Sequence, residues 1–142
     1  MRALIVLGLN YQQVVPIQAI SAQQNIPKRF LEQILNDLKS MGIVASKRGV
    51  AGGYRLRVPP ETITLATVIR HIEGALAPVS CVSTLYYEKC SCPHEATCGI
   101  RSVMKEVRDA IVRILEGYTV ADLCERARKL KAEQPSPQDY VI

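Results

Sequence analysis

The sequence of 142 residues predicts a mainly α-helical fold that carries one small two-stranded β wing. Three observations support this prediction. Apolar residues recur at helical spacing in residues 28–41, a basic glycine-rich segment at 47–53 separates two short runs with strand character, and a long amphipathic run follows residue 98. The length fits one domain, or one domain with an added dimerisation arm.

Two helices are expected before residue 26. Residues 2–11 are apolar nearly all round, which predicts a buried helix. A shorter helix is expected over residues 14–25, because Pro16 suits the first turn of a helix and Asn25 can adopt the left-handed conformation that ends one.

A third helix is expected over about residues 28–41, with Gly42 as its C-terminal cap. Its apolar face, expected to pack on the core, holds Leu31, Ile34, Leu35, Leu38 and Met41. Its opposite face holds Arg29, Glu32, Gln33, Asn36 and Ser40. Arg and Gln carry donors suited to guanine and adenine, and Glu can accept from cytosine, so this face is a candidate for reading base edges in the DNA major groove. An ordinary solvated helix face is the alternative.

Two short strands are expected at residues 43–46 and 54–58, joined by the glycine-rich tip at 47–53. Glycines let a backbone turn sharply and approach a groove closely. Arg48 is expected to enter a DNA minor groove, and three further basic side chains can face phosphates: Lys47, Arg55 and Arg57. An ordinary flexible hairpin is the alternative.

Three helices followed by a basic hairpin form the element order of a winged helix-turn-helix. This order predicts a surface that binds double-stranded DNA. The residues expected to form it are Lys28, Arg29, Glu32, Gln33, Asn36, Lys47, Arg48, Gly49, Tyr54 and Arg55.

Further helices are expected after the wing. Thr64 can cap one that ends at Gly74, a long helix is expected over about residues 99–116, and Thr119 can cap a last helix. Residues 78–98 show no clear period. By expected role the chain divides into a winged helix-turn-helix domain (1–76), a cysteine-rich loop (77–98), a dimerisation helix with the final helix (99–131) and a tail expected to be disordered (132–142).

Charge is unevenly distributed along the chain. Residues 1–60 hold eight Lys/Arg and two Asp/Glu, whereas residues 61–142 hold ten and eleven. A basic first part favours a polyanionic partner, although solubility alone would also account for it. Two His and no paired carboxylates leave no acid–base constellation, so no enzyme is expected. The apolar run at 3–9 is too short to span a bilayer and marginal as a secretory signal, which favours a cytoplasmic protein.

Four of the five cysteines gather in one segment: Cys81, Cys90, Cys92 and Cys98. An odd count argues against a disulfide framework, and in a reducing compartment clustered thiols favour metal or redox chemistry. Thiolates near a helix that starts at Gly99 suit an iron–sulfur cluster, zinc or copper(I). A structural zinc site and a metal-free thiol switch remain alternatives. Cys124 is expected to be a packed core thiol.

Several strings of residues in this chain resemble a known family. They are Val15-Pro16-Ile17, Gln24-Asn25-Ile26-Pro27, Leu31-Glu32-Gln33, Arg48-Gly49, Gly52-Gly53-Tyr54, Cys92-Pro93 and Tyr118-Thr119-Val120-Ala121-Asp122-Leu123. Together they closely resemble the Rrf2 family of bacterial winged-helix transcription regulators, which includes IscR and NsrR. The resemblance covers roughly residues 3–130.

The resemblance implies a homodimer in which the long helices cross. An apolar stripe for that contact is supplied by Val103, Val107, Ala110, Ile111 and Ile114. It also implies base contacts from Glu32 and Gln33 and a minor-groove contact from Arg48. The implied activity is that of a repressor or dual regulator, which senses redox, iron–sulfur or nitrosative status through a cluster of the two-iron or four-iron type.

The resemblance places cluster ligands at Cys81, Cys92 and Cys98. Cys90 is an extra thiol that can supply the fourth ligand or replace Cys81. Arg101 stands where IscR has a ligating His and is not expected to ligate, and His94 is a minor candidate.

Two alternatives follow from variation within the family. Some relatives work without a cluster or respond to metabolic enzymes, so a cluster-free or zinc-bound regulator, controlled by thiol chemistry or by an enzyme partner, stays open. Relatives also extend further before the position of Arg2, so a truncated or misassigned start is expected.

Overall fold

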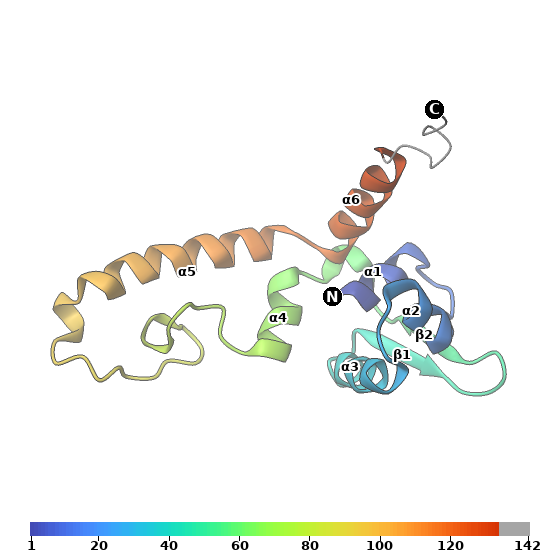
Figure 1. The fold of residues 1–142 in the computed structure, drawn as a ribbon, viewed down its shortest axis with the longest axis horizontal. Coiled ribbons are helices and arrows are strands. Elements are labelled where there is room, and N and C mark those ends of the chain that lie inside the picture. Colours follow the sequence, from blue (N-terminus) through green and yellow to red (C-terminus); the bar gives the residue numbers. More distant parts are fainter. Residues whose placement is uncertain (134–142) are drawn as a thin grey trace, which may run out of the picture. The chain divides into compact units, whose positions relative to one another are not determined.

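The computed structural model describes residues 1–133, which form two compact units (Figure 1). The first unit consists of residues 1–63 and the segment that begins at Thr119, and the second consists of residues 64–118. The helix after Thr64, grouped above with the winged helix, therefore lies in the second unit by its contacts, and the division by role remains a prediction.

The three expected N-terminal helices are present as α1 (Arg2–Leu9), α2 (Ile17–Gln24) and α3 (Lys28–Ser40). Asn25 ends α2 in the left-handed conformation, with φ 49°, as its short polar side chain allows. Gly42, with φ +74°, follows α3 as expected of a C-terminal cap.

The start of α2 corrects the sequence-based boundary. The helix begins at Ile17 rather than at residue 14, and Pro16 precedes its first turn with an extended ψ of 142°. Val15 is extended because it forms an isolated antiparallel bridge with Tyr54, a residue far along the chain. Because that pairing keeps Val15 extended, α2 can begin only after it, with Pro16 as the N-cap residue.

The wing is an antiparallel pair, β1 (Val44–Lys47) and β2 (Gly53–Leu56), each shifted from its expected place by one or two residues. Its register runs from the pair Val44↔Leu56, buried at the base, to Lys47↔Gly53 at the tip. Gly49 has φ +102°, which side-chain-bearing residues rarely adopt. A Cβ on Gly53 would collide with the backbone carbonyl oxygen of Val15, so only glycine fits there.

In the aliphatic core of the first unit, the first helix of the chain packs against the last helix that the structure describes. Helix α6 (Val120–Glu133) packs on α1 and on the 3-10 turn η1 (Pro60–Thr62). The Cys124 thiol donates to Ile5 O at 3.5 Å, and a Cβ on Gly8 would lie 2.7 Å from Cys124 Sγ. The fully buried large side chains of this unit are Leu4, Val6, Leu7, Ile20, Leu31, Leu35, Leu38, Val44, Leu56 and Val120.

The second unit contains α4 (Leu65–Glu73), the 3-10 turns η2 (Ser80–Val82) and η3 (Glu95–Thr97), and the long α5 (Gly99–Gly117). Thr64 caps α4 by accepting from Thr67 N at 3.2 Å, as expected. Arg70 of α4 forms an ion pair with Glu116 of α5 at 2.7 Å. No residue of α5 is buried, so its apolar side chains lack a complete packing partner within the chain.

The expected tail needs one correction. Helix α6 continues to Glu133, beyond the expected end near residue 131, so residues 132 and 133 are helical. The remainder of the predicted tail, 134–142, lies outside the described residues. Within the described part of the chain, no helix is long and apolar enough to cross a membrane.

Candidate DNA-binding surface and cysteine cluster

The polar face of α3 is exposed as the sequence predicts. Leu31, Leu35 and Leu38 are buried and anchor the helix, which leaves the opposite face to solvent. The exposed residues of that face include the predicted base-reading set Lys28, Arg29, Glu32, Gln33 and Asn36. Phe30 is the exception to this polar pattern, because it is a large apolar residue with 58% of its surface exposed.

A groove of about 340 Å³ runs between the wing, α2 and α3. Its lining includes five residues of the predicted DNA surface: Asn36, Lys47, Arg48, Gly49 and Tyr54. Three basic side chains face it, from Lys39, Lys47 and Arg48, and its lining contains no acidic residue. This groove therefore has the charge that favours a phosphate backbone.

The structure does not bring every predicted DNA contact to this groove. Lys28, Arg29, Glu32, Gln33 and Arg55 do not line it, although all five are exposed on the same unit. Tyr54 is only partly exposed, and its backbone is paired with Val15.

Sequence reasoning missed three polar residues of this groove: Gln18, Lys39 and Ser46. Lys39 carried a usable signal, because it lies on the polar side of α3, one turn beyond Asn36. Gln18 carried none, since it lines the groove only through the packing of α2 beside the wing.

The four clustered cysteines come from three places in the second unit. Cys81 lies in η2, Cys90 and Cys92 lie in the loop before η3, and Cys98 is the N-cap of α5. The Cys98 thiol accepts a hydrogen bond from Arg101 N at 3.4 Å, which satisfies one of the free amides at the start of α5. The fold thus places all four of these cysteines in the second unit.

The thiols interact in series, in the order Cys81, Cys90, Cys92, Cys98. Hydrogen bonds from the Cys92 side chain and backbone lower the pKa of Cys90. The same side-chain hydrogen bond, with repulsion from Cys90, raises the pKa of Cys92 to about 11. Partial burial, followed by the charge of Cys90, raises the pKa of Cys81.

The metal-binding role of these cysteines stays a prediction. Across residues 1–133, no three or more His, Cys, Asp or Glu side chains are placed so that they could hold a metal ion. Pairwise interactions link the four thiols, and soft thiolates are the ligands that iron–sulfur clusters take. Three of the four are partly exposed and one is fully exposed, so the site is accessible for assembly.

Charged side chains around the cysteines were missed from the sequence. The Glu95 carboxylate accepts from the Tyr87 hydroxyl at 3.0 and 2.9 Å and pairs with Arg101 Nε at 3.0 Å. Arg101 Nε also donates to Cys81 O at 3.2 Å. No periodic signal marks these contacts, because they join a loop, a 3-10 turn and a helix.

Two further candidate residues are not among the four clustered cysteines. Cys124 is buried in the first unit, as expected of a core thiol, and burial raises its pKa. His94 is exposed in the cysteine loop, and its ligand role stays a prediction.

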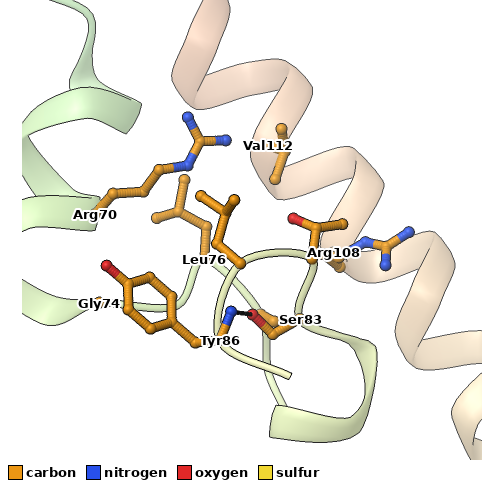
Figure 2. A pocket seen from close by; sticks show the side chains of 10 residues that line it. Arg70, Gly74, Leu76, Ser83, Tyr86, Arg108 and Val112 are labelled. Carbon is orange, nitrogen blue, oxygen red and sulfur yellow. Dashed lines mark hydrogen bonds between the residues drawn. The ribbon is translucent and has the colours of Figure 1, made fainter. Parts of the chain in front are cut away.

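A small cavity in the second unit lies between α4, α5 and the segment after α4. Figure 2 shows Arg70 on α4, and Arg108 and Val112 on α5, around the loop in which Tyr86 N donates to Ser83 Oγ at 3.0 Å. The cavity volume is about 10 Å³, which is room for about one water molecule. It is a packing gap rather than a ligand site.

Comparison with known proteins agrees with this architecture. Residues 1–126 match the model of the Rrf2 family, described as iron-dependent transcriptional regulators. The chain is 39% identical over 112 residues to an rrf2-like HTH-type transcriptional regulator of Rhodobacter capsulatus, which covers 78% of this chain and 75% of that protein. It is 32% identical over 133 residues to the HTH-type transcriptional regulator NsrR of Geobacillus kaustophilus, covering 93% and 88%.

Among solved structures, the chain is similar to CymR, the global cysteine regulator of B. subtilis. The TM-score is 0.71 at 29% identity, over 87% of this chain and 88% of that one. These relatives are regulators of transcription, in agreement with the expectation that the chain is not an enzyme. The metabolic-enzyme partner that the sequence left open finds no support among them. Because its fold contains a winged helix and residues 1–126 match the family model, the chain belongs to the Rrf2 family of transcriptional regulators.

Proposed function

We propose that this regulator binds operator DNA as a homodimer and that an iron–sulfur cluster, held by its clustered cysteines, changes its affinity for that DNA. The observation that carries the proposal is the gathering of four cysteines, whose thiols interact pairwise, in the second unit of a winged-helix regulator. The description of the family as iron-dependent supports it. A transcription regulator acts on the chromosome, so the proposal includes the cytoplasmic location expected from the sequence.

The DNA contacts of this proposal divide by chemistry. Exposed Glu32 and Gln33 on α3 read base edges in the major groove, where an amide suits adenine and a carboxylate suits cytosine. Arg48 at the wing tip enters the minor groove, because its guanidinium is favoured where that groove is narrow. Lys39 and Lys47 in the groove beside α3 neutralise phosphates, which sets affinity rather than sequence choice.

The cluster ligands in this proposal are Cys81, Cys92 and Cys98, with Cys90 as the fourth. When bound, the cluster supplies a centre that responds to oxidants and to nitric oxide. The chain contributes thiols from three segments, and Cys98 also caps α5, so any change at the site acts directly on the start of the long helix.

The dimer in this proposal is formed through α5. Val103 and Ile114 each leave 54% of their surface exposed, and Val107 leaves 38%. These residues share one face of the helix with Ala110 and Ile111, and no residue of α5 is buried within the chain. A second α5 would cover this stripe, and a dimer would present two copies of α3 to the two half-sites of an operator.

The test compares loaded and cluster-free protein on the same DNA. Protein is purified without oxygen, its iron and acid-labile sulfide are quantified, and operators are selected from random duplexes. We expect brown protein with matched iron and sulfide and at least a tenfold affinity difference between the two forms. Equal affinity in both forms would remove the sensing role. Single Cys81→Ala and Cys90→Ala variants then decide which thiol is required for loading.

A second candidate function rests on the central position of Cys90. Its thiol interacts with both Cys81 and Cys92, and such neighbouring thiols are suited to a metal-free thiol switch, with a zinc-bound form as the other version. Colourless protein that stays colourless after reconstitution would favour this candidate. Zinc analysis and disulfide mapping would then separate its two versions.

A further inference from the structure

The short turn η2, which carries Cys81, ends in two carbonyl groups without backbone partners. Within η2, Ser80 O accepts from Ser83 N at 3.0 Å and from Glu88 N at 3.4 Å. No backbone amide among residues 1–133 donates to Cys81 O or Val82 O. Carbonyls at the end of a helical turn need other donors, particularly where the segment is buried, and Val82 is only 2% exposed.

Two arginines of α5 supply these donors. Arg101 Nε donates to Cys81 O at 3.2 Å, and Arg108 Nη1 donates to Val82 O at 2.5 Å. The two arginines are seven residues apart, about two helical turns, so they lie on the same face of α5. The side chains of Arg101 and Arg108 are only 23% and 18% exposed, which protects their hydrogen bonds from competition by water.

Each arginine is itself held by a carboxylate. Asp109 Oδ1 accepts from Arg108 Nε at 2.9 Å and from Nη2 at 2.6 Å, which leaves Nη1 for Val82 O. Arg101 pairs with Glu95 of η3, so this one side chain joins the Cys81 segment to the loop between Cys92 and Cys98.

We propose that Arg101 and Arg108 are positioning residues that clamp the Cys81 segment onto α5 and so hold Cys81 beside the other thiols before any cluster is bound. The role of this clamp in cluster binding rests on the proposed function, whereas the hydrogen bonds that form it do not depend on that function. Without it, the turn would keep the packing of Val82 and the hydrogen bonds of Ser80 O but neither of these hydrogen bonds to α5, and Cys81 would move away from the other thiols more often.

The experiment measures how fast Cys81 is alkylated in reduced, cluster-free, full-length protein. A short pulse of iodoacetamide is followed by peptide mass spectrometry, with buried Cys124 as the internal reference. The variants are Arg101→Gln and Arg108→Gln. The matched control is Arg113→Gln, because Arg113 is exposed on the same helix and its side chain forms no hydrogen bond or ion pair with residues 1–133.

We expect Cys81 to react about three- to tenfold faster in R108Q than in the wild type or R113Q, as for loss of one ordinary hydrogen bond. R101Q should give a smaller increase, because the Arg101 charge that it removes also lowers the pKa of Cys81. Cys124 should stay unlabelled, and the melting temperature should change little. R101K should give an intermediate rate, because a lysine keeps the charge but not the planar donor group. The R101K variant also keeps the inference testable if R101Q does not fold.

The loaded protein gives a separate readout. Chelator-induced loss of iron should be several times faster in R101Q and R108Q than in R113Q. If the wild type never holds iron and sulfide, the cluster proposal fails, while the alkylation rates still decide the clamp. Equal Cys81 alkylation in R101Q, R108Q and R113Q would overturn the inference, whatever the iron content.

Discussion

Val15 and Tyr54 exchange two backbone hydrogen bonds, from Val15 N to Tyr54 O at 2.8 Å and from Tyr54 N to Val15 O at 2.9 Å. This bridge ties the residue before Pro16 and α2 to the second strand of the wing. It therefore orients the wing relative to the helix-turn-helix. The bridge also gives the backbone of Tyr54 a structural role that the sequence does not reveal.

Gly53→Ala should break this bridge. The added Cβ would meet the backbone carbonyl of Val15, and backbone cannot move aside as a side-chain end can. We expect a loss of about 2 kcal/mol in the free energy of unfolding, together with weaker DNA binding. Chemical denaturation measures the first effect. Gly117→Ala is the control, because a Cβ at that position would have no neighbour within 4 Å, and an equal loss in both variants would contradict the prediction.

Lys39→Ala should weaken binding to all DNA sequences alike, since a phosphate contact carries no sequence information. If the wild-type dimer neutralises about six phosphates, its affinity should fall roughly a thousandfold between 50 and 200 mM salt. The variant should lower the slope of log affinity against log salt by roughly one for each phosphate that is no longer neutralised. Fluorescence anisotropy across a salt series measures this slope. An unchanged slope would place Lys39 outside the interface.

Gln33→Ala should relax sequence preference rather than abolish binding. An amide that bridges two atoms of one base contributes about 1–3 kcal/mol of discrimination at that base pair. Binding to a library with each operator position varied should therefore lose selectivity at one position per half-site. Arg113→Ala serves as the control, and loss of affinity without any change in preference would assign Gln33 to a backbone contact.

Cys90 should be the most reactive of the clustered thiols in the reduced, cluster-free protein. Hydrogen bonds from Cys92 lower the pKa of Cys90, whereas the pKa of Cys92 is raised to about 11. At pH 8 the thiolate fraction is therefore larger at Cys90, and alkylation should be several times faster there. The difference should shrink as the pH approaches 11. Cys92→Ala should slow the reaction of Cys90, and an unchanged rate would refute this cause.

Asp122→Ala should lower the melting temperature at neutral pH by a few degrees. The carboxylate accepts from Thr119 Oγ1 and Thr119 N, both at 2.7 Å, while Thr119 Oγ1 accepts from Asp122 N at 3.3 Å, a reciprocal cap for α6. These hydrogen bonds, the side-chain one first, lower the pKa of Asp122. Its contribution is therefore complete above the unfolded-state pKa and is lost as the pH falls through the lower folded-state pKa.

Thermal melts at several pH values check this dependence. The difference between the wild type and D122A should disappear in strong acid. Glu106→Ala is the control, because Glu106 is exposed on α5. A difference that persists at low pH would show that the carboxylate charge is not the cause.

Features that depend on nearby residues could be predicted from the sequence. The spacing of Leu31, Leu35 and Leu38 located α3, and the caps at Thr64 and Thr119 were confirmed because a cap is a contact across three residues. The clustering of Cys90, Cys92 and Cys98 could also be predicted, because these three residues lie close together in the sequence. These signals were enough for the fold class, whereas the family was inferred from the resemblance of several residue strings.

Features that depend on distant residues could not be predicted in the same way. The start of α2 depends on Tyr54, and the setting of Cys81 depends on Arg101 and Arg108. Neither pairing leaves a periodic trace, because each partner looks like an ordinary strand or helix residue in its own segment. The packing of α6 on α1 is of the same kind, since it joins opposite ends of the described chain.

The backbone around residues 63–65 and 118–120 has a consequence for how such regulators can diversify. Within the first unit, Val120 N donates to Ile63 O at 2.9 Å, and within the second, Leu65 N donates to Tyr118 O at 2.9 Å. Each unit thus keeps its two connecting ends together, as an inserted module does in a host that closes behind it. Exchange of this module during evolution would replace the unit that carries the four clustered cysteines while the winged-helix unit keeps its own core.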